Sequence, residues 1–117
     1  MHQRTKEETI QFVSNYCTNN LGTYKPLNLY FFGSRANGIP RPESDYDFFL
    51  VVSDSSPEEV NTGGSLHSKL YDEFEAVRLK EGFYLIDLLI QRYTSFSESK
   101  LNNSTFAYQA VKGQLIF

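Results

Sequence analysis

Cysteine and histidine are scarce in this chain, which has one cysteine, Cys17, and two histidines, His2 and His67, among its 117 residues. One cysteine cannot form an intrachain disulfide. With no cysteine or histidine partner at ligand spacing, a zinc site is not expected, and neither histidine is predicted to have a functional role. Cys17 lies four residues after Val13 in a helical pattern, so we expect it to be a small buried hydrophobic residue.

Long apolar runs and an excess of positive charge are also missing. No stretch approaches the roughly 18 apolar residues of a membrane span, and the N-terminal MHQRTKEET has no apolar signal-peptide core, so we expect a cytoplasmic protein without membrane association. The 14 acidic residues outnumber the 11 basic ones, giving a net charge of -3. Sequence-independent binding to nucleic acid requires many Lys and Arg contacts to phosphate, and a nucleic-acid partner is therefore not expected. A single nucleotide remains compatible, because magnesium can meet its charge.

What is present is the composition of one folded domain over residues 1–117, with 40% hydrophobic and 21% charged residues. Apolar periodicity and turn residues predict the order of the elements. They are a helix at 4–20, a strand at 27–32, a helical turn at 34–38 capped by Ser34, an extended loop at 39–43, a strand at 45–52, a mobile polar loop at 53–64, a helix from 66 that ends at Gly82, a strand at 83–91, a helix at about 97–112 and a short edge strand at 115–117.

The strands at 45–52 and 83–91 are apolar on both alternating faces, which is typical of central strands in a covered sheet. Asp87 is the only charge in the second of them, FYLIDLLI. Burying an unpaired carboxylate is unfavourable. Two possibilities are open: a metal ion shared with Asp45 and Asp47, or a salt bridge to a Lys or Arg.

The most informative stretch runs from Phe32 to Val52. Gly33 and Ser34 end one strand pattern, and ten residues later Asp45 and Asp47 open the next. Gly33 lets backbone approach a phosphate, and Ser34 offers it an amide and a hydroxyl. The two aspartates leave the same face of a strand, roughly 6.6 Å apart. Such a pair can hold the hard divalent cations that phosphoryl or nucleotidyl transfer needs.

Two neighbouring polar residues are candidates for supporting roles. Arg35 either contacts a phosphate or pairs structurally with Glu43 or Asp45. Ser44 either orients one of the aspartates by a hydrogen bond or caps a turn.

Gly-Ser, ten residues, Asp-x-Asp and a third Asp on a later strand together resemble the nucleotidyltransferase superfamily, and within it the minimal nucleotidyltransferases of prokaryotes. Gly33-Ser34, Asp45-Tyr46-Asp47 and Asp87 match that pattern, and Arg35, Ala36 and Gly38 stand in their usual places. The resemblance extends over the element order of the whole chain. It implies an α/β (α+β) fold with a small mixed sheet flanked by helices.

The resemblance also implies an activity: transfer of a nucleoside monophosphate, AMP from ATP, to a hydroxyl. Asp45, Asp47 and Asp87 would hold two Mg²⁺ ions and Asp87 would help to deprotonate the hydroxyl, while Gly33 and Ser34 would bind the β- and γ-phosphates. Minimal members are commonly encoded beside a helical HEPN-domain protein. By resemblance, this chain would be an antitoxin that adds AMP to a tyrosine of a toxic HEPN ribonuclease.

Competing interpretations of the sequence belong to different functional classes. A dehalogenase-type phosphatase places its Asp pair after a strand, and an EF-hand loop needs a glycine where this chain has Leu50, so both fail. A metal-dependent glycosyltransferase would need a larger chain. An antitoxin that neutralises its partner by contact alone, and nucleotidyl transfer to a small molecule, both stay open. The candidates for a partner surface are aromatic residues outside the strands, namely Tyr24, Tyr93, Phe96 and Tyr108.

Overall fold

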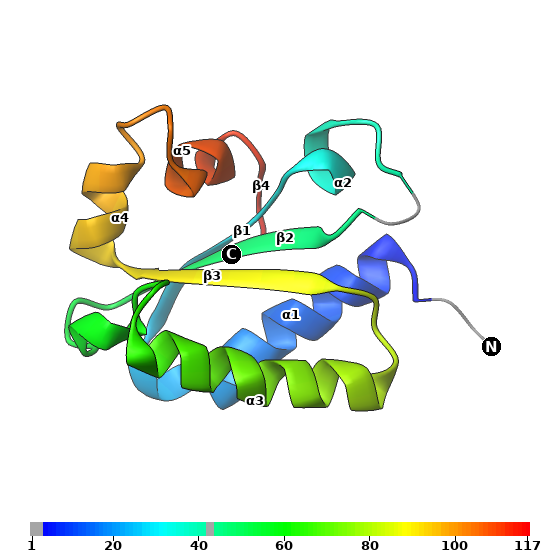
Figure 1. The fold of residues 1–117 in the computed structure, drawn as a ribbon, viewed down its shortest axis with the longest axis horizontal. Helices are drawn as coiled ribbons and strands as arrows, with labels where there is room; N and C mark the ends of the chain where they lie inside the picture. Colours follow the sequence, from blue (N-terminus) through cyan, green and yellow to red (C-terminus); the bar gives the residue numbers. More distant parts are fainter. Residues whose placement is uncertain (1–3, 42–43) are drawn as a thin grey trace.

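A four-stranded mixed sheet forms the centre of the protein in the computed structural model, which describes residues 4–41 and 44–117 (Figure 1). The strands are β1 (Pro26–Phe32), β2 (Tyr46–Val52), β3 (Ile86–Arg92) and β4 (Gln114–Leu115), in the spatial order β3-β2-β1-β4. β1 is antiparallel to both β2 and β4, whereas β2 and β3 are parallel. The parallel pair needs a long crossover, and residues 53–85 supply it.

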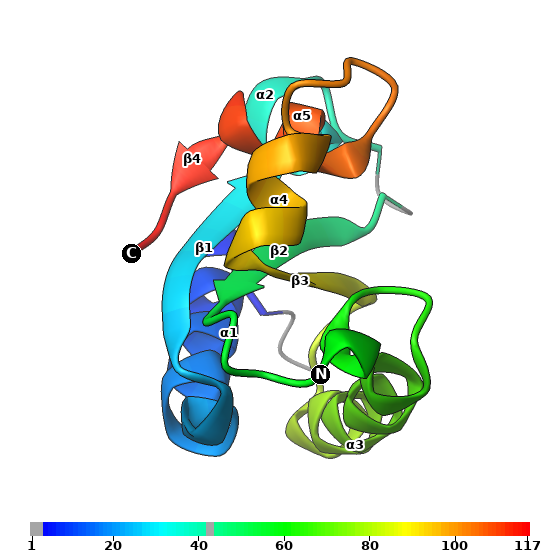
Figure 2. The same cartoon turned by 90° about the vertical axis from the view of Figure 1, so that its left-hand side faces the viewer.

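Helices cover both faces of this sheet, as Figures 1 and 2 show from two sides. The long helices α1 (Lys6–Asn20) and α3 (Ser65–Glu81) lie on one face, and the short helices α2 (Ser34–Asn37), α4 (Tyr93–Ser99) and α5 (Phe106–Val111) lie on the other. Two 3₁₀ turns, η1 (Gly22–Tyr24) and η2 (Glu58–Val60), occupy connections. The predicted α/β fold with a small mixed sheet flanked by helices is thereby confirmed. None of the helices in these described ranges is long and apolar enough to cross a membrane.

The long helices begin and end at the residues that the sequence indicates. Thr5 caps α1 in a reciprocal capping box: its hydroxyl accepts from the Glu8 amide, and the Glu8 carboxylate accepts from the Thr5 amide. Gly82 ends α3 with a φ of 78°, in the left-handed region that favours glycine. The apolar stripe of α3 packs into the core as expected, with Phe74 fully buried.

Alternation along the strands produces one hydrophobic cluster on each face of the sheet. On the α1/α3 face, Phe48 and Leu88 join helix residues such as Val13, Cys17 and Phe74. On the α4/α5 face the cluster is smaller and consists of Phe32, Phe49, Val51, Leu89, Phe96, Ala107 and Ala110. Asp47 and Asp87 belong to this second face because they are two residues away from Phe49 and Leu89.

The C-terminal segment differs from the sequence prediction. The single helix expected at 97–112 is two helices, α4 and α5, and α4 already begins at Tyr93. The connection is a polar turn in which the Asn102 side-chain oxygen accepts hydrogen bonds from the amide and hydroxyl of Ser104. Thr105 then caps α5 by accepting from the Tyr108 amide. Local side-chain bonds of this kind compete with helix formation and interrupt it here.

β3 is an edge strand of this sheet, not the central strand that its apolar sequence indicates, and it begins at Ile86 instead of Phe83. Its open edge is covered by hydrogen bonds from elsewhere in the chain. Thr62 exchanges bonds with both backbone groups of Ile90, and the Asn61 side chain accepts from the Arg92 amide. The polar segment 53–64 is therefore not the loose loop that its composition suggests: Val60 within it is fully buried.

Candidate active site

Two of the predicted site residues, Asp47 and Asp87, stand side by side on neighbouring strands. The parallel register of β2 and β3 makes them direct partners, and both side chains leave the sheet on the α4/α5 face. Both are half-buried. Among the described residues, ion pairs join Arg4 to Glu8 and Arg78 to Glu75. Within the same residues, the Asp87 carboxylate forms no hydrogen bond or ion pair. A salt bridge for Asp87 is thus not supported in this part of the chain.

The crowding of these carboxylates raises their pKa values. Burial raises the pKa of Asp47 to about 6, with further contributions from the negative charges of Asp87 and Asp45. The pKa of Asp87 is raised as well, by burial first and then by the charge of Asp45, while His67 acts in the opposite direction. A site that disfavours its own ionised form in this way is suited to a cation that neutralises it.

Asp45, the third predicted ligand, lies immediately before β2 and not within it, and its side chain is exposed. Its charge acts on both Asp47 and Asp87, so it is near them. As the side chains stand, however, no three His, Cys, Asp or Glu residues in the described ranges are grouped closely enough to hold a metal ion. The structure therefore brings Asp47 and Asp87 together, but Asp45 does not complete a three-carboxylate site with them among the described residues.

Gly33 lies directly against the Asp47 carboxylate. A Cβ atom built at Gly33 would collide with the Asp47 Oδ2 atom, and the residue has a φ of 84°, so only glycine fits here. Gly33 is also the N-cap of α2, the position that the sequence pattern assigns to Ser34. Ser34 is instead the first, exposed residue of that helical turn. The turn therefore begins beside the carboxylates, where its first amides have no partner within the helix.

Arg35 connects this helical turn to the loop before β2. Its Nε donates to the Ser44 carbonyl at 2.8 Å and its Nη2 to the Arg41 carbonyl at 3.4 Å. The guanidinium also lies over the Tyr46 ring, 4.5 Å from the centroid. Of the two structural pairs expected for Arg35, the one with Asp45 is not found among the described residues, and Glu43 lies outside them. These contacts give Arg35 a structural role, and its phosphate contact stays a prediction.

Ser44 closes a turn in the same loop. Its hydroxyl accepts from the Arg41 amide at 2.9 Å, and its own amide donates to the Arg41 carbonyl. These are the bonds of the turn-capping alternative. No bond from Ser44 to Asp45 or Asp47 is formed in the part of the loop that the structure describes.

Two residues of α3 that sequence reasoning missed support Asp87. The Tyr71 hydroxyl donates to the Ile86 carbonyl, and the ring Nε2 of His67 lies 2.9 Å from the Leu88 carbonyl, so both bind the backbone on either side of Asp87. The two rings stack 5.9 Å apart. Burial raises the pKa of Tyr71 to about 12, so its hydroxyl keeps its proton. The sequence shows His67 and Tyr71 at i, i+4 spacing beside the apolar stripe of their helix. Nothing in the local sequence indicates that these two side chains face an edge strand.

The sequence profile of a family described as "Polymerase beta, Nucleotidyltransferase" matches residues 13–117 of the chain. The match includes both strands that hold the aspartates and the Gly33–Ser34 turn. No curated protein and no solved structure matches the chain significantly.

Proposed function

The chain belongs to the polymerase beta nucleotidyltransferase family, and we propose that it is a Mg²⁺-dependent enzyme that transfers AMP from ATP to a hydroxyl group. One observation carries the proposal. Asp47 and Asp87 are direct register partners, and Gly33 touches Asp47 at the start of a helical turn. These contacts support the proposal, because a glycine turn that would bind phosphates adjoins carboxylates that would hold cations, the juxtaposition that nucleotidyl transfer needs.

The donor set fits magnesium in chemistry. Carboxylate oxygens are the ligands that Mg²⁺ prefers, and Asp47 and Asp87 repel each other in its absence. Asp45, Asp47 and Asp87 would hold the metal, which supplies Lewis-acid polarisation of the phosphate and neutralises charge. The exposed position of Asp45 leaves its side chain accessible to a bound nucleotide.

In the proposed reaction, the acceptor oxygen forms a bond to the α-phosphorus while the bond to the β-phosphate oxygen breaks and pyrophosphate leaves. The acceptor proton would pass to the Asp87 carboxylate, which stands beside Asp47 on the neighbouring strand. The Gly33–Ser34 turn would hold the β- and γ-phosphates through backbone amides and the Ser34 hydroxyl. Arg35 and Ser44 would keep the loop before Asp45 in place through the bonds described above.

We further propose that the acceptor is a tyrosine of a HEPN-domain toxin, and that the chain acts as its antitoxin in a hetero-oligomer. The resemblance to minimal nucleotidyltransferases supports this assignment. Large apolar side chains are also exposed around the α4/α5 face, including Tyr93 (53% exposed) and Leu101 (81%). Of the other aromatic candidates for a partner surface, Phe96 is excluded because it is 3% exposed and belongs to the core, and Tyr24 packs against the other cluster.

The first experiment combines ATP binding with transfer to the HEPN protein. ATP affinity should depend on Mg²⁺, and in the presence of both proteins the partner should gain the mass of AMP and lose ribonuclease activity. Asp87→Asn should retain much of the ATP binding but reduce transfer at least about 100-fold, because it removes the proton acceptor. Asp72→Asn, which changes an exposed aspartate of α3, is the matched control.

Three results would contradict the proposal in different ways. ATP affinity that does not change with Mg²⁺, or with Asp45→Asn plus Asp47→Asn, would overturn the site. Silencing of the partner without a mass change, and equally by the double variant, would show an antitoxin that works by contact alone. Transfer to small hydroxyl compounds in place of the HEPN protein would identify a small-molecule acceptor.

A further inference from the structure

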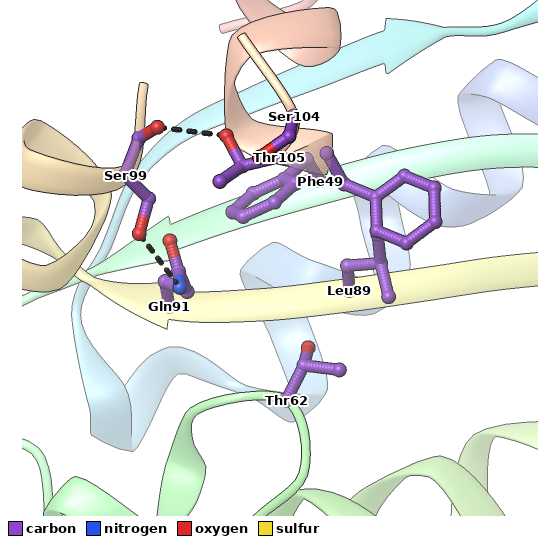
Figure 3. Close-up of a pocket in the computed structure, with 8 residues that line it drawn as sticks. Phe49, Thr62, Leu89, Gln91, Ser99, Ser104 and Thr105 are labelled. Carbon is purple, nitrogen blue, oxygen red and sulfur yellow. Dashed lines mark hydrogen bonds between the residues drawn. The ribbon is translucent and has the colours of Figure 1, made fainter. Parts of the chain in front are cut away.

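A pocket of about 280 Å³ lies on the same face of the sheet as the carboxylates. Phe49 of β2 and Leu89 of β3 line it from below, and the end of α4 and the start of α5 close it from above (Figure 3). The Thr105 hydroxyl donates to the Ser99 carbonyl at 2.7 Å and so ties the two helices together over the strands.

The pocket continues the candidate active site along the strands. Phe49 is two residues beyond Asp47, and Leu89 is two residues beyond Asp87, so each lies roughly 6.6 Å farther along the same face. Gly33 and the α2 turn adjoin Asp47 from the neighbouring strand β1, and the pocket does not include them. The face therefore holds, in order, Gly33 with the α2 turn, the carboxylates and the pocket.

The lining indicates a neutral ligand with hydrogen-bonding edges. None of the eight lining residues is charged. Phe49 and Leu89 offer an apolar floor, and Phe106, which is 65% exposed at the start of α5, offers an aromatic ring at the mouth. The remaining residues carry hydroxyl or amide groups. A flat heteroaromatic ring combines the apolar faces and polar edges that such a lining complements.

Gln91 supplies a specific hydrogen-bonding group. Its Nε2 donates to the Ser99 hydroxyl at 3.3 Å, whereas its Oε1 is buried and has no hydrogen-bond partner among the described residues. Figure 3 shows the amide rising from β3 toward Ser99. A buried acceptor without a donor is costly, and a ligand that brings an N–H group to it would remove the cost.

We propose that this pocket binds the nucleobase of the donor nucleotide and that Gln91 selects adenine through its exocyclic amino group. The inference rests on the proposed function, which places the phosphates and the metal beside the pocket. A glutamine amide pairs with adenine by two hydrogen bonds, one to the amino group and one to a ring nitrogen. The acceptor tyrosine fits the pocket less well, because its hydroxyl must reach the carboxylates and its ring would leave the Gln91 oxygen unpaired.

The test measures the affinities of ATP, GTP and tripolyphosphate, each with Mg²⁺, for the intact chain. Wild type should prefer ATP to GTP by roughly tenfold or more. Gln91→Leu should lower ATP affinity by a similar factor and bring the ATP/GTP ratio close to one, with tripolyphosphate unaffected. Gln11→Leu, which changes an exposed glutamine of α1, should leave all three affinities unchanged.

Ser104→Phe provides a second, independent variant if Gln91→Leu folds poorly. Ser104 is an exposed lining residue in the turn before α5, so a larger side chain there narrows the pocket with little effect on the core. This variant should lower the affinity for ATP but leave the affinity for tripolyphosphate unchanged. An unchanged ATP/GTP ratio in Gln91→Leu, or an unchanged ATP affinity in Ser104→Phe, would overturn the proposal, and a higher KM for the acceptor alone would assign the pocket to the acceptor instead. If the wild-type chain does not bind tripolyphosphate in the presence of Mg²⁺, the proposed function itself is refuted.

Discussion

At the scale of single residues, the chain keeps two like charges together at a cost in stability. The folded-state pKa of Asp47, about 6, exceeds the ordinary value of 3.8. Folding therefore favours the protonated carboxyl, and ionisation destabilises the fold. The penalty is fully present above pH 6 and shrinks as the pH falls, disappearing only below 3.8, where the carboxyl is protonated in both states.

Removing one of these charges should stabilise the metal-free protein. We expect Asp47→Asn to raise the unfolding free energy at pH 7 by about 1 kcal/mol. This is less than the whole pKa difference would give, because the side chain is only half-buried and solvent screens its charge. The gain corresponds to a melting temperature about 5 °C higher. Thermal unfolding of both proteins with chelator, from pH 4 to pH 8, measures this. The advantage of the variant should shrink steadily below pH 6.

The exposed Asp72→Asn variant is the control for a general charge effect, and it should show no such pH-dependent gain. A less stable Asp47→Asn protein at pH 7 would mean that the ionised carboxylate contributes to the fold, and the account of a site awaiting a cation would be wrong.

Spacing predicted that Gly33, Asp47 and Asp87 would lie together, and the structure brings them together: Asp47 and Asp87 are register partners and Gly33 lies against Asp47. Their role in binding phosphate and metal stays a prediction. The roles of Arg35 and Ser44 were not decidable, since each depends on which backbone carbonyls the loop presents to it. Gln91 gave no signal at all, because only the fold shows that its oxygen is buried and has no hydrogen-bond partner among the described residues.

At the scale of elements, the edge strand β3 is held by side chains from α3 and from residues 61–62. An uncovered edge carries unpaired backbone groups that invite association with other chains. Here Tyr71 and His67 bind the carbonyls that flank Asp87, so the same contacts protect the edge and fix the position of the carboxylate.

Loss of the Tyr71 hydroxyl should therefore weaken this strand. We expect Tyr71→Phe to lower the unfolding free energy by about 1 to 2 kcal/mol, because the Ile86 carbonyl loses its donor. Hydrogen exchange should become faster at the β3 amides first. Tyr93→Phe, at an exposed tyrosine of α4, should have no measurable effect on either quantity. Equal exchange rates in wild type and Tyr71→Phe would show that the strand does not depend on this bond.

The elements themselves were readable wherever the pattern was long. α1 and α3 have caps and stripes over four or more turns, and β2 is apolar except for Asp47. Periodicity failed over residues 97–112, where the Asn102–Thr105 turn interrupts a helix-like pattern. It also could not tell an edge strand from a central one, because residues 83–90 are apolar on both faces apart from Asp87. The open edge of β3 is satisfied by residues far away in sequence.

At the scale of the whole molecule, the two faces of the sheet have different tasks. The α1/α3 face is filled by the larger core cluster, and the α4/α5 face carries the carboxylates, the pocket and a smaller cluster. Under the proposed function, a protein acceptor would place its hydroxyl at the carboxylates and would therefore dock against the α4/α5 face.

Docking against this face predicts which exposed apolar residues contact the proposed partner. Leu101 follows α4 and is 81% exposed, whereas Leu79, 66% exposed, lies on α3 across the sheet. Leu101→Asp should weaken association with the HEPN protein about tenfold or more and slow its modification, because a charge would enter an apolar interface. Leu79→Asp should leave association unchanged. Calorimetric titration of the partner measures both, with ATP affinity as the check that each variant keeps an intact site. Equal losses of partner affinity in the two variants, or a loss only in Leu79→Asp, would contradict this prediction. The partner would then dock somewhere other than the face that holds the aspartates.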